Sequence, residues 1–126
     1  MSLRSPLGKV LGLGTAKDGT DHWWGQRMSA VALALLGLWF TVSLLRLPGF
    51  EHALVVDFIS APLNSVLMVL LCATLAYHSY LGVQVVLEDY VHGPGLKVAS
   101  LTASKFAHVF VAVASIYAVL KIGLGA

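Results

Sequence analysis

The chain has 126 residues, of which 58% are hydrophobic and only 11% are charged, and its net charge is +2 at pH 7. Soluble domains are about half apolar and a quarter charged, so this composition, with a mean hydropathy of +0.84, excludes an ordinary water-soluble protein. A core this small cannot hide so much apolar surface, and lipid must cover the rest. The basic residues lie near the ends of apolar segments rather than in one patch, which argues against nucleic-acid binding. The single cysteine, Cys72, excludes an internal disulfide and a cysteine-ligated cluster.

Three apolar segments are each long enough to cross a bilayer. A hydrocarbon core of ~30 Å needs about 20 helical residues at 1.5 Å per residue. We predict spans over about residues 28–46, 62–87 and 101–123. The chain then divides into a polar N-terminal lead-in, 1–26, and a three-helix transmembrane domain, 27–126. The predicted fold class is an all-α integral membrane protein with three transmembrane helices.

The distribution of Lys and Arg predicts how these spans are oriented. Six basic residues precede span one or lie between spans two and three, and two lie on the other side. The first group is Arg4, Lys9, Lys17, Arg27, Lys97 and Lys105, and the second is Arg46 and Lys121. The positive-inside rule therefore places the N-terminus in the cytoplasm. The lead-in is too polar and too broken by glycines for a cleaved signal peptide, so span one is retained.

An ionisable side chain, His78, lies in the middle of the second predicted span. It precedes Asp89 by eleven residues, which places it ~16 Å deep, near the bilayer midplane, and on the same helix face as Asp89. Hydrocarbon offers such a group no partner, so it must face a bundle interior, a cavity or a cofactor. Gly82, one turn further on, leaves room for a flat macrocycle, which favours axial ligation of a haem iron. The alternative is a histidine bonded to a neighbouring helix, with Gly82 allowing close helix packing.

A histidine of the third span, His108, is a poor candidate for a second ligand of the same iron. It lies ~10 Å shallower than His78, so the two imidazoles would not reach one metal easily. We expect a second ligand to come from another subunit. His108 is expected to pack with Ser104 and Ser115, which share its helix face.

Proton-exchanging side chains follow the second span directly. Tyr90 offers a hydroxyl donor, and Asp89 beside it offers a carboxylate that orients the donor or relays protons, which suits the reduction of a quinone carbonyl. The alternative is a helix C-terminus at the membrane surface, with Tyr90 in the aromatic belt. Arg27, at the same interface, has the charge to clamp a haem propionate or a polarised quinone oxygen, or it acts only as a topological determinant.

Two stretches of this sequence resemble a known family, the small D-type membrane-anchor subunit of succinate dehydrogenase, respiratory complex II. They are residues 22–30, HWWGQRMSA, and residues 78–93, HSYLGVQVVLEDYVHG. The second is the more specific, because its histidine, glycine and aspartate-tyrosine pair match the family pattern in identity and spacing. The glycine-rich segment Gly12 to Gly19 is similar to the alphaproteobacterial form of this subunit.

The resemblance implies a three-span anchor that forms half of a two-chain bundle. It implies that His78 is an axial ligand of haem b and its iron, that Tyr90 and Asp89 belong to a ubiquinone site, and that Arg27 lies near the haem propionates or the quinone mouth. The expected partners are a cytochrome b-type anchor subunit, an iron-sulfur subunit and a flavoprotein subunit. FAD and the iron-sulfur clusters would lie in those partners, and this chain holds no succinate-oxidising site.

Two other functions remain open at this point. The first is the fumarate-reductase branch of the same superfamily, in which electrons run from menaquinol. The second is a non-redox helical scaffold or transporter subunit, in which His78 and Asp89 form a proton path. The expected location is a bacterial inner membrane, with the mitochondrial inner membrane as the alternative.

Overall fold

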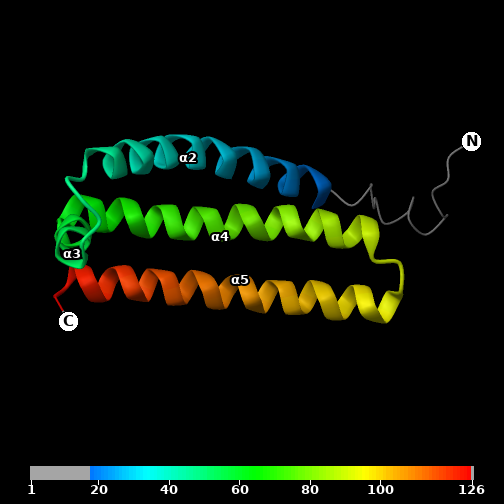
Figure 1. Cartoon of the computed structure of the whole chain (residues 1–126). Coiled ribbons are helices and arrows are strands. Elements are labelled where there is room, and N and C mark those ends of the chain that lie inside the picture. The colour runs from blue at the N-terminus through cyan, green and yellow to red at the C-terminus, as the bar shows by residue number, and fades with distance from the viewer. Residues whose placement is uncertain (1–17, 126) are drawn as a thin grey trace, which may run out of the picture.

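The computed structural model describes residues 18–125, and this part of the chain is helical, with no strand. Its helices are α2 (Asp18–Arg46), α3 (His52–Ser60), α4 (Pro62–Tyr90) and α5 (Pro94–Gly123) (Figure 1). Three of them contain apolar stretches long enough to span a membrane, over Thr20–Arg46, Pro62–Tyr90 and Pro94–Gly123. The predicted all-α class with three spans is confirmed.

The long helices extend beyond the predicted spans at their polar ends. α2 begins at Asp18, ten residues before the predicted first span, while the rest of the predicted lead-in, 1–17, lies outside the described residues. Proline occupies the first position of α4 and of α5, where its missing N–H costs no intrahelical hydrogen bond. Helices of 29 and 30 residues are about 45 Å long, so their ends project past a ~30 Å core unless they tilt.

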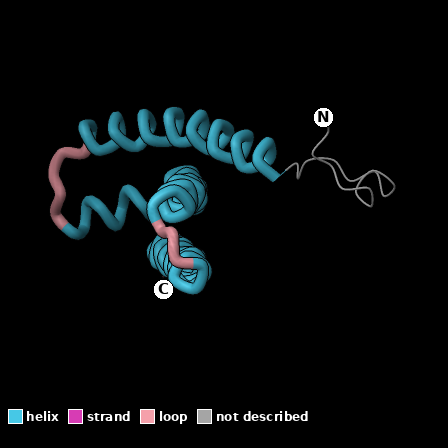
Figure 2. Tube along the Cα trace, turned by 90° about the vertical axis from the view of Figure 1, so that its right-hand side faces the viewer, coloured by secondary structure: helices cyan, strands magenta, loops and turns pink. Residues whose placement is uncertain are grey.

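α4 is the central helix of the bundle. It packs against α5 along its length and against α2 on another side, whereas α2 and α5 make no contact with each other. In Figure 2, α4 and α5 are seen nearly end-on while α2 is seen from the side, so α2 crosses α4 at an angle and α5 runs along it. The start of α2, the end of α4 and the start of α5 lie at one end of the bundle (Figure 1). The predicted cytoplasmic location of that end rests on the charge distribution alone.

The short helix α3 was not predicted from the sequence. It connects the end of α2 to the start of α4 and lies across the long helices (Figure 2). The Asn64 amide donates to the Phe58 carbonyl at 2.8 Å, the Ser65 hydroxyl donates to the Ile59 carbonyl at 2.6 Å, and the Phe58 ring stacks on Trp39 of α2 at 6.1 Å. These contacts hold α3 between α2 and α4 at the end of the bundle opposite the α4–α5 turn.

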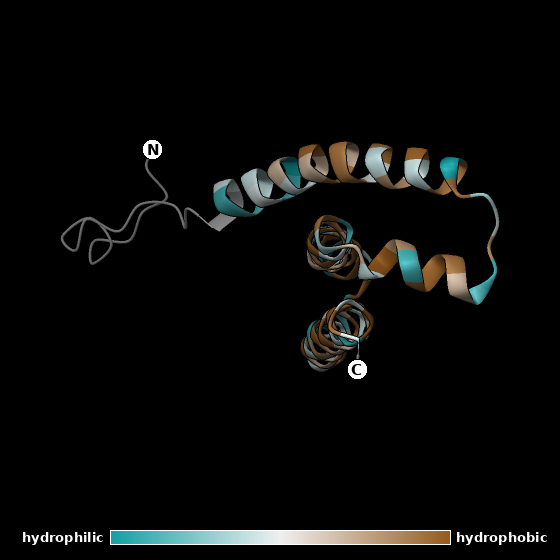
Figure 3. Cartoon of the chain, turned by 90° about the vertical axis from the view of Figure 1, so that its left-hand side faces the viewer, coloured by the Kyte–Doolittle hydropathy of each residue, from teal (hydrophilic) through white to brown (hydrophobic). Residues whose placement is uncertain are grey.

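Few side chains are buried within this chain. Among the described residues only Leu81, Val119 and Ser29 are buried, and many large apolar side chains along the three long helices are exposed. Figure 3 shows hydrophobic residues in the middle of α2 and hydrophilic ones near its ends. Lipid or other helices must cover this apolar surface, as expected for a multi-pass protein of the bacterial inner membrane.

Candidate functional site

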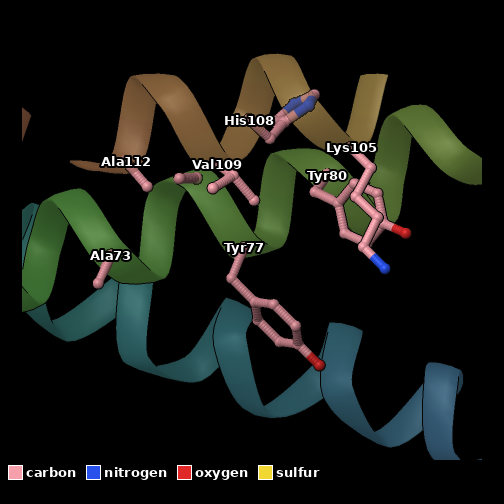
Figure 4. Close-up of a pocket in the computed structure, with 8 residues that line it drawn as sticks. Ala73, Tyr77, Tyr80, Lys105, His108, Val109 and Ala112 are labelled. Atoms are coloured by element: carbon pink, nitrogen blue, oxygen red, sulfur yellow. The ribbon is translucent and has the colours of Figure 1, made fainter. Parts of the chain in front are cut away.

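The contact between α2 and α4 is close because a glycine faces a tyrosine. A Cβ added at Gly25 would lie 2.6 Å from the Tyr77 hydroxyl and 3.3 Å from a Leu81 methyl group. Figure 4 shows Tyr77 directed from α4 toward α2. Gly25 and Ser29 are four residues apart, the small-xxx-small spacing that lets two membrane helices approach. We call this contact the α2–α4 seam, formed by Gly25, Gln26, Ser29, Tyr77, His78 and Leu81.

His78 lies in the α2–α4 seam and is bonded to α2. Its Nδ1 atom is 2.9 Å from the Ser29 hydroxyl oxygen, and its Nε2 atom is 3.5 Å from the amide nitrogen of Gln26. The first is a good hydrogen-bond distance and the second is at the limit of one. His78 is half-buried and Ser29 is buried. His78 is therefore hydrogen-bonded to a neighbouring helix, as the alternative to a haem ligand predicted.

Gly82, by contrast, is not required by helix packing within this chain. A Cβ at Gly82 would meet only the Gln26 amide nitrogen, at 3.8 Å, which is an ordinary van der Waals contact. The close approach of α2 to α4 depends on Gly25 instead. A small side chain at Gly82 would therefore be accommodated by the described residues.

Two buried polar atoms in the same region have no hydrogen-bond partner among the described residues. They are Nε2 of His22 and Oε1 of Gln26, which lie one turn apart on α2. Buried polar groups in proteins are nearly always satisfied, so such atoms indicate a missing polar partner.

His108 lies in the other helix contact, between α4 and α5, which we call the α4–α5 seam. Its Nδ1 is 2.7 Å from the Ser104 carbonyl, its Nε2 is 3.2 Å from the Ser79 hydroxyl, and its ring packs edge-on against Tyr80. Figure 4 shows His108, Tyr80 and Lys105 around an apolar pocket of this seam. The expected packing with Ser104 is present. The Ser115 hydroxyl instead bonds to carbonyls of its own helix, and Ser79 supplies the second contact.

The turn after α4 is held by two side chains that donate hydrogen bonds to main-chain carbonyls. The Lys97 ammonium of α5 donates to the Glu88 carbonyl at 2.7 Å, and a basic side chain at a helix C-terminus is favourable to the helix dipole. Nδ1 of His92 donates to the Tyr90 carbonyl at 3.0 Å. These bonds hold the backbone at the end of α4 and leave the Tyr90 side chain free, with 78% of it exposed.

The structure does not bring all the predicted site residues together. Asp89 and Tyr90 are exposed at the end of α4, three turns from His78 on the same helix. The Arg27 side chain is also exposed, and its guanidinium carbon lies 5.4 Å from the centre of the Trp23 ring, a cation–π distance. Within residues 18–125, no hydrogen bond joins His78 to Arg27, Asp89 or Tyr90. His78 therefore lies between two helices, whereas the other three side chains are exposed in the described part of the chain.

Two partners of His78, Ser29 and Gln26, were not assigned a role from the sequence. Antiparallel neighbouring spans bring the start of span one beside the end of span two, and the Gly25/Ser29 pair marks the face that packs. The antiparallel arrangement and the Gly25/Ser29 spacing together would have identified the Ser29 hydroxyl as a partner of His78. Residues 18–125 hold no cluster of three His, Cys, Asp or Glu side chains for a metal ion.

Fold and site together define a small multi-pass membrane protein with a polar residue cluster between apolar helices. The family model for the succinate dehydrogenase/fumarate reductase transmembrane subunit matches residues 1–120, and the chain belongs to this family. It is 32% identical over 120 residues to the succinate dehydrogenase hydrophobic membrane anchor subunit of Rickettsia bellii, covering 95% of this chain and 96% of that one. It is 30% identical over 122 residues to the protein of the same description in Paracoccus denitrificans, covering 97% and 94%.

A third relative extends this set. The succinate dehydrogenase membrane anchor subunit of Reclinomonas americana is 32% identical over 97 residues, which cover 74% of this chain and 80% of that one. The resemblance to alphaproteobacterial anchor subunits is thereby confirmed. Its relatives support the role of a membrane-anchor subunit of succinate dehydrogenase, and membership of this family implies association with other subunits and involvement of a quinone.

Proposed function

We propose that this chain anchors a succinate:ubiquinone oxidoreductase, co-ligates a haem b through His78 and contributes Tyr90 and Asp89 to the site of ubiquinone reduction. It docks an iron-sulfur subunit and a flavoprotein subunit at the membrane and pairs with a cytochrome b-type anchor chain. Succinate is oxidised in the flavoprotein, and the electrons reach quinone at the membrane surface beside this chain.

The observation that carries the haem assignment is the position of His78 beside a glycine that helix packing does not require. The imidazole is half-buried in the middle of α4, and among the described residues a Cβ at Gly82, one turn away, would meet only the Gln26 amide nitrogen, at an ordinary van der Waals distance of 3.8 Å. Gly82 is therefore not explained by packing of α2 against α4, whereas a flat macrocycle beside an axial ligand needs the room that a glycine leaves. The unpartnered atoms of His22 and Gln26 lie on the helix that faces His78 and favour a further polar group there.

These residues fit a haem, provided that the second ligand comes from another chain. A bound b haem supplies one-electron transfer between the iron-sulfur subunit and the quinone site. His78 holds the iron, and the apolar side chains of the helices exclude water and set a low local dielectric. Both nitrogens of His108 already have hydrogen-bond partners, which argues against His108 as the second ligand.

The quinone assignment depends on the end of α4. The Tyr90 ring is exposed, and its hydroxyl has no hydrogen-bond partner among residues 18–125, so it is free to donate to a quinone carbonyl oxygen. Reduction of that oxygen develops negative charge, which the hydroxyl stabilises and then neutralises by giving up its proton, and Asp89 relays a proton from water back to the Tyr90 oxygen. Arg27, exposed on α2, supplies positive charge for a haem propionate or a polarised quinone oxygen.

The exposed helix faces provide the surface for the partner anchor chain. α2 and α5 lie on different sides of α4 without touching, so the outer faces of both helices are left uncovered by the described residues. Exposed apolar side chains line both, including Val31, Leu35, Val109 and Val113. One of these faces packs against the second anchor chain and the other faces lipid.

The test is a succinate-reduced minus oxidised visible spectrum of the complex purified through a tag on this chain. Bands of a six-coordinate b haem, with flavoprotein and iron-sulfur subunits in the same preparation, are expected. A haem-free preparation that still contains the flavoprotein would overturn the His78 assignment and keep the anchor role. Absence of both would favour the non-redox scaffold.

Fumarate reduction is the second candidate, because the family description covers both enzymes. The descriptions of the most similar relatives favour succinate dehydrogenase. Turnover of the purified complex in both directions, with ubiquinone and with menaquinol, separates the two. We expect succinate-driven ubiquinone reduction to be the faster reaction.

A further inference from the structure

The hydroxyl of Ser29 is the most deeply placed polar side chain of the described residues. Only 7% of Ser29 is exposed, and it is the one buried polar residue in residues 20–125. Its Oγ atom is 2.7 Å from the Gly25 carbonyl, 3.1 Å from the Gln26 carbonyl and 2.9 Å from Nδ1 of His78. A serine buried in a membrane helix commonly bonds back to its own helix, but the contact to a histidine of another helix needs a separate explanation.

The three distances determine where the protons lie. A serine hydroxyl has one proton, and a carbonyl oxygen only accepts. If that proton pointed to His78, the Ser29 and Gly25 oxygens would face each other at 2.7 Å with no hydrogen between them. The hydroxyl therefore donates to the Gly25 carbonyl and accepts from His78, so that Nδ1 of His78 carries the ring proton.

This assignment fixes the other nitrogen of the ring. In a neutral imidazole with hydrogen on Nδ1, Nε2 keeps its lone pair and is the nitrogen available to a metal. The Gln26 amide at 3.5 Å is too distant to hold that lone pair firmly. Each bond in the series from the His78 N–H through the Ser29 hydroxyl to the Gly25 carbonyl polarises the next, which makes Nε2 a better electron donor.

We propose that Ser29 is a positioning residue for the haem ligand: its buried hydroxyl accepts the Nδ1 proton of His78, fixes the ring orientation and leaves Nε2 for iron. This inference rests on the proposed role of His78 as axial ligand. It assigns to α2 a part in tuning the iron, in addition to its part in helix packing. The Ser29 hydroxyl acts through His78 and makes no contact with the iron itself.

The test compares Ser29→Ala with Ser115→Ala in the purified complex. Ser115 is a matched control, because its hydroxyl bonds to carbonyls of its own helix at 2.7 and 3.0 Å and contacts no histidine in the described part of the chain. Removal of a hydrogen-bond partner of a metal-ligating histidine weakens metal binding by about 10- to 100-fold. We expect Ser29→Ala to weaken haem retention by a factor in that range.

The haem midpoint potential gives a readout that does not depend on turnover. Loss of the Nδ1 bond makes Nε2 a weaker donor, which destabilises the ferric state more than the ferrous state, so the potential of Ser29→Ala should become more positive. The signals of the ferric haem in electron paramagnetic resonance should shift as well, because the ring is no longer held in one orientation. Ser115→Ala should match the wild type in all three measurements.

The pair Ser29→Thr and Ser29→Val covers the case in which the alanine variant assembles poorly. Thr and Val have the same shape, and only Thr keeps the hydroxyl, so Thr should preserve the potential and Val should not. Equal potentials and equal haem retention in these two variants would overturn the role of Ser29. An unchanged haem spectrum in His78→Ala, measured in parallel, would instead overturn the proposed ligand, and the two failures are thereby distinguished.

Discussion

The two helix seams of this protein each contain a half-buried histidine bonded to a serine. The two histidines differ in whether both ring nitrogens have a close hydrogen-bond partner. In the α4–α5 seam both nitrogens of His108 have partners, at 2.7 Å and 3.2 Å. In the α2–α4 seam Nδ1 of His78 has a partner at 2.9 Å, and Nε2 has only the 3.5 Å contact with Gln26. A satisfied histidine joins two helices, and a half-satisfied one keeps a lone pair for a ligand.

Two glycines, one on α2 and one on α4, also differ in how closely other side chains approach them. Gly25 permits the close contact with Tyr77 and Leu81, whereas a Cβ at Gly82 would meet only the Gln26 amide nitrogen, at 3.8 Å, among the described residues. The close approach of α2 to α4 thus requires the first glycine and not the second. We propose that the α2–α4 seam both packs and holds a ligand, and that His108 in the α4–α5 seam serves packing.

The largest expected difference between the seams is in haem content. His78→Ala should abolish haem in the purified complex, because the iron loses its ligand from this chain. His108→Ala should keep the full haem complement, because both His108 nitrogens are already bonded, one to Ser104 of its own helix and one to Ser79 of α4. Haem is measured per complex by pyridine haemochrome absorbance, with flavin content as the control for assembly. Haem loss in the His108 variant with flavin intact would reverse our assignment of the two seams.

A substitution at the end of α4 tests whether the quinone site is separate from the haem ligand in the α2–α4 seam. Tyr90→Phe should lower succinate-driven ubiquinone reduction on the order of 100-fold, because a hydrogen-bond donor to the developing oxyanion is lost. It should leave the haem spectrum unchanged, the opposite of His78→Ala. Tyr117→Phe is the matched control, since Tyr117 is also an exposed tyrosine, on α5. Turnover of Tyr90→Phe equal to that of Tyr117→Phe would remove Tyr90 from the quinone site.

The sequence predicted the three spans and the class of fold because hydropathy and charge report directly on lipid exposure. It did not predict α3, whose nine residues follow no separate apolar span, nor the start of α2 at Asp18. The prediction that His78 faces a bundle interior, a cavity or a cofactor followed from the cost of a polar group in lipid, but its partner Ser29 depends on the crossing of α2 over α4. Crossing geometry is set by packing between segments far apart in the chain, and periodicity within one segment carries no information on it.

The two glycines give a smaller effect that sharpens the contrast within the α2–α4 seam. Gly25→Ala should destabilise the bundle by about 1 kcal/mol, because its Cβ would lie 2.6 Å from the Tyr77 hydroxyl and the half-exposed Tyr77 side chain must move aside. Gly82→Ala should change stability by less than about 0.5 kcal/mol, since its Cβ would meet one atom at 3.8 Å. Thermal unfolding of the detergent-solubilised complex measures both. Equal losses would mean that the seam is packed uniformly, contrary to the haem position proposed beside Gly82.

The smallest expected effect lies in the α4–α5 seam, at the bond between Ser79 and His108. Hydrogen bonds between membrane helices contribute about 0.6 kcal/mol on average, because the separated helices find other partners. Ser79→Ala should therefore cost about that much in a detergent-unfolding equilibrium, and Ser100→Ala, whose hydroxyl bonds only to the Lys97 carbonyl of its own helix, should cost less.

A double-mutant cycle with Ser79→Ala and His108→Ala isolates the pair, since each single change removes the same bond. A coupling free energy near about 0.6 kcal/mol, with haem content and potential unchanged in every variant, would show that this bond joins α4 to α5 and does nothing else. A shift of the haem potential in Ser79→Ala would contradict that, because His108 would then influence the iron through the same kind of serine contact as His78. The contrast between the two seams can therefore be tested at the Ser79–His108 bond. Its loss should lower the free energy of unfolding and leave haem content and potential unchanged.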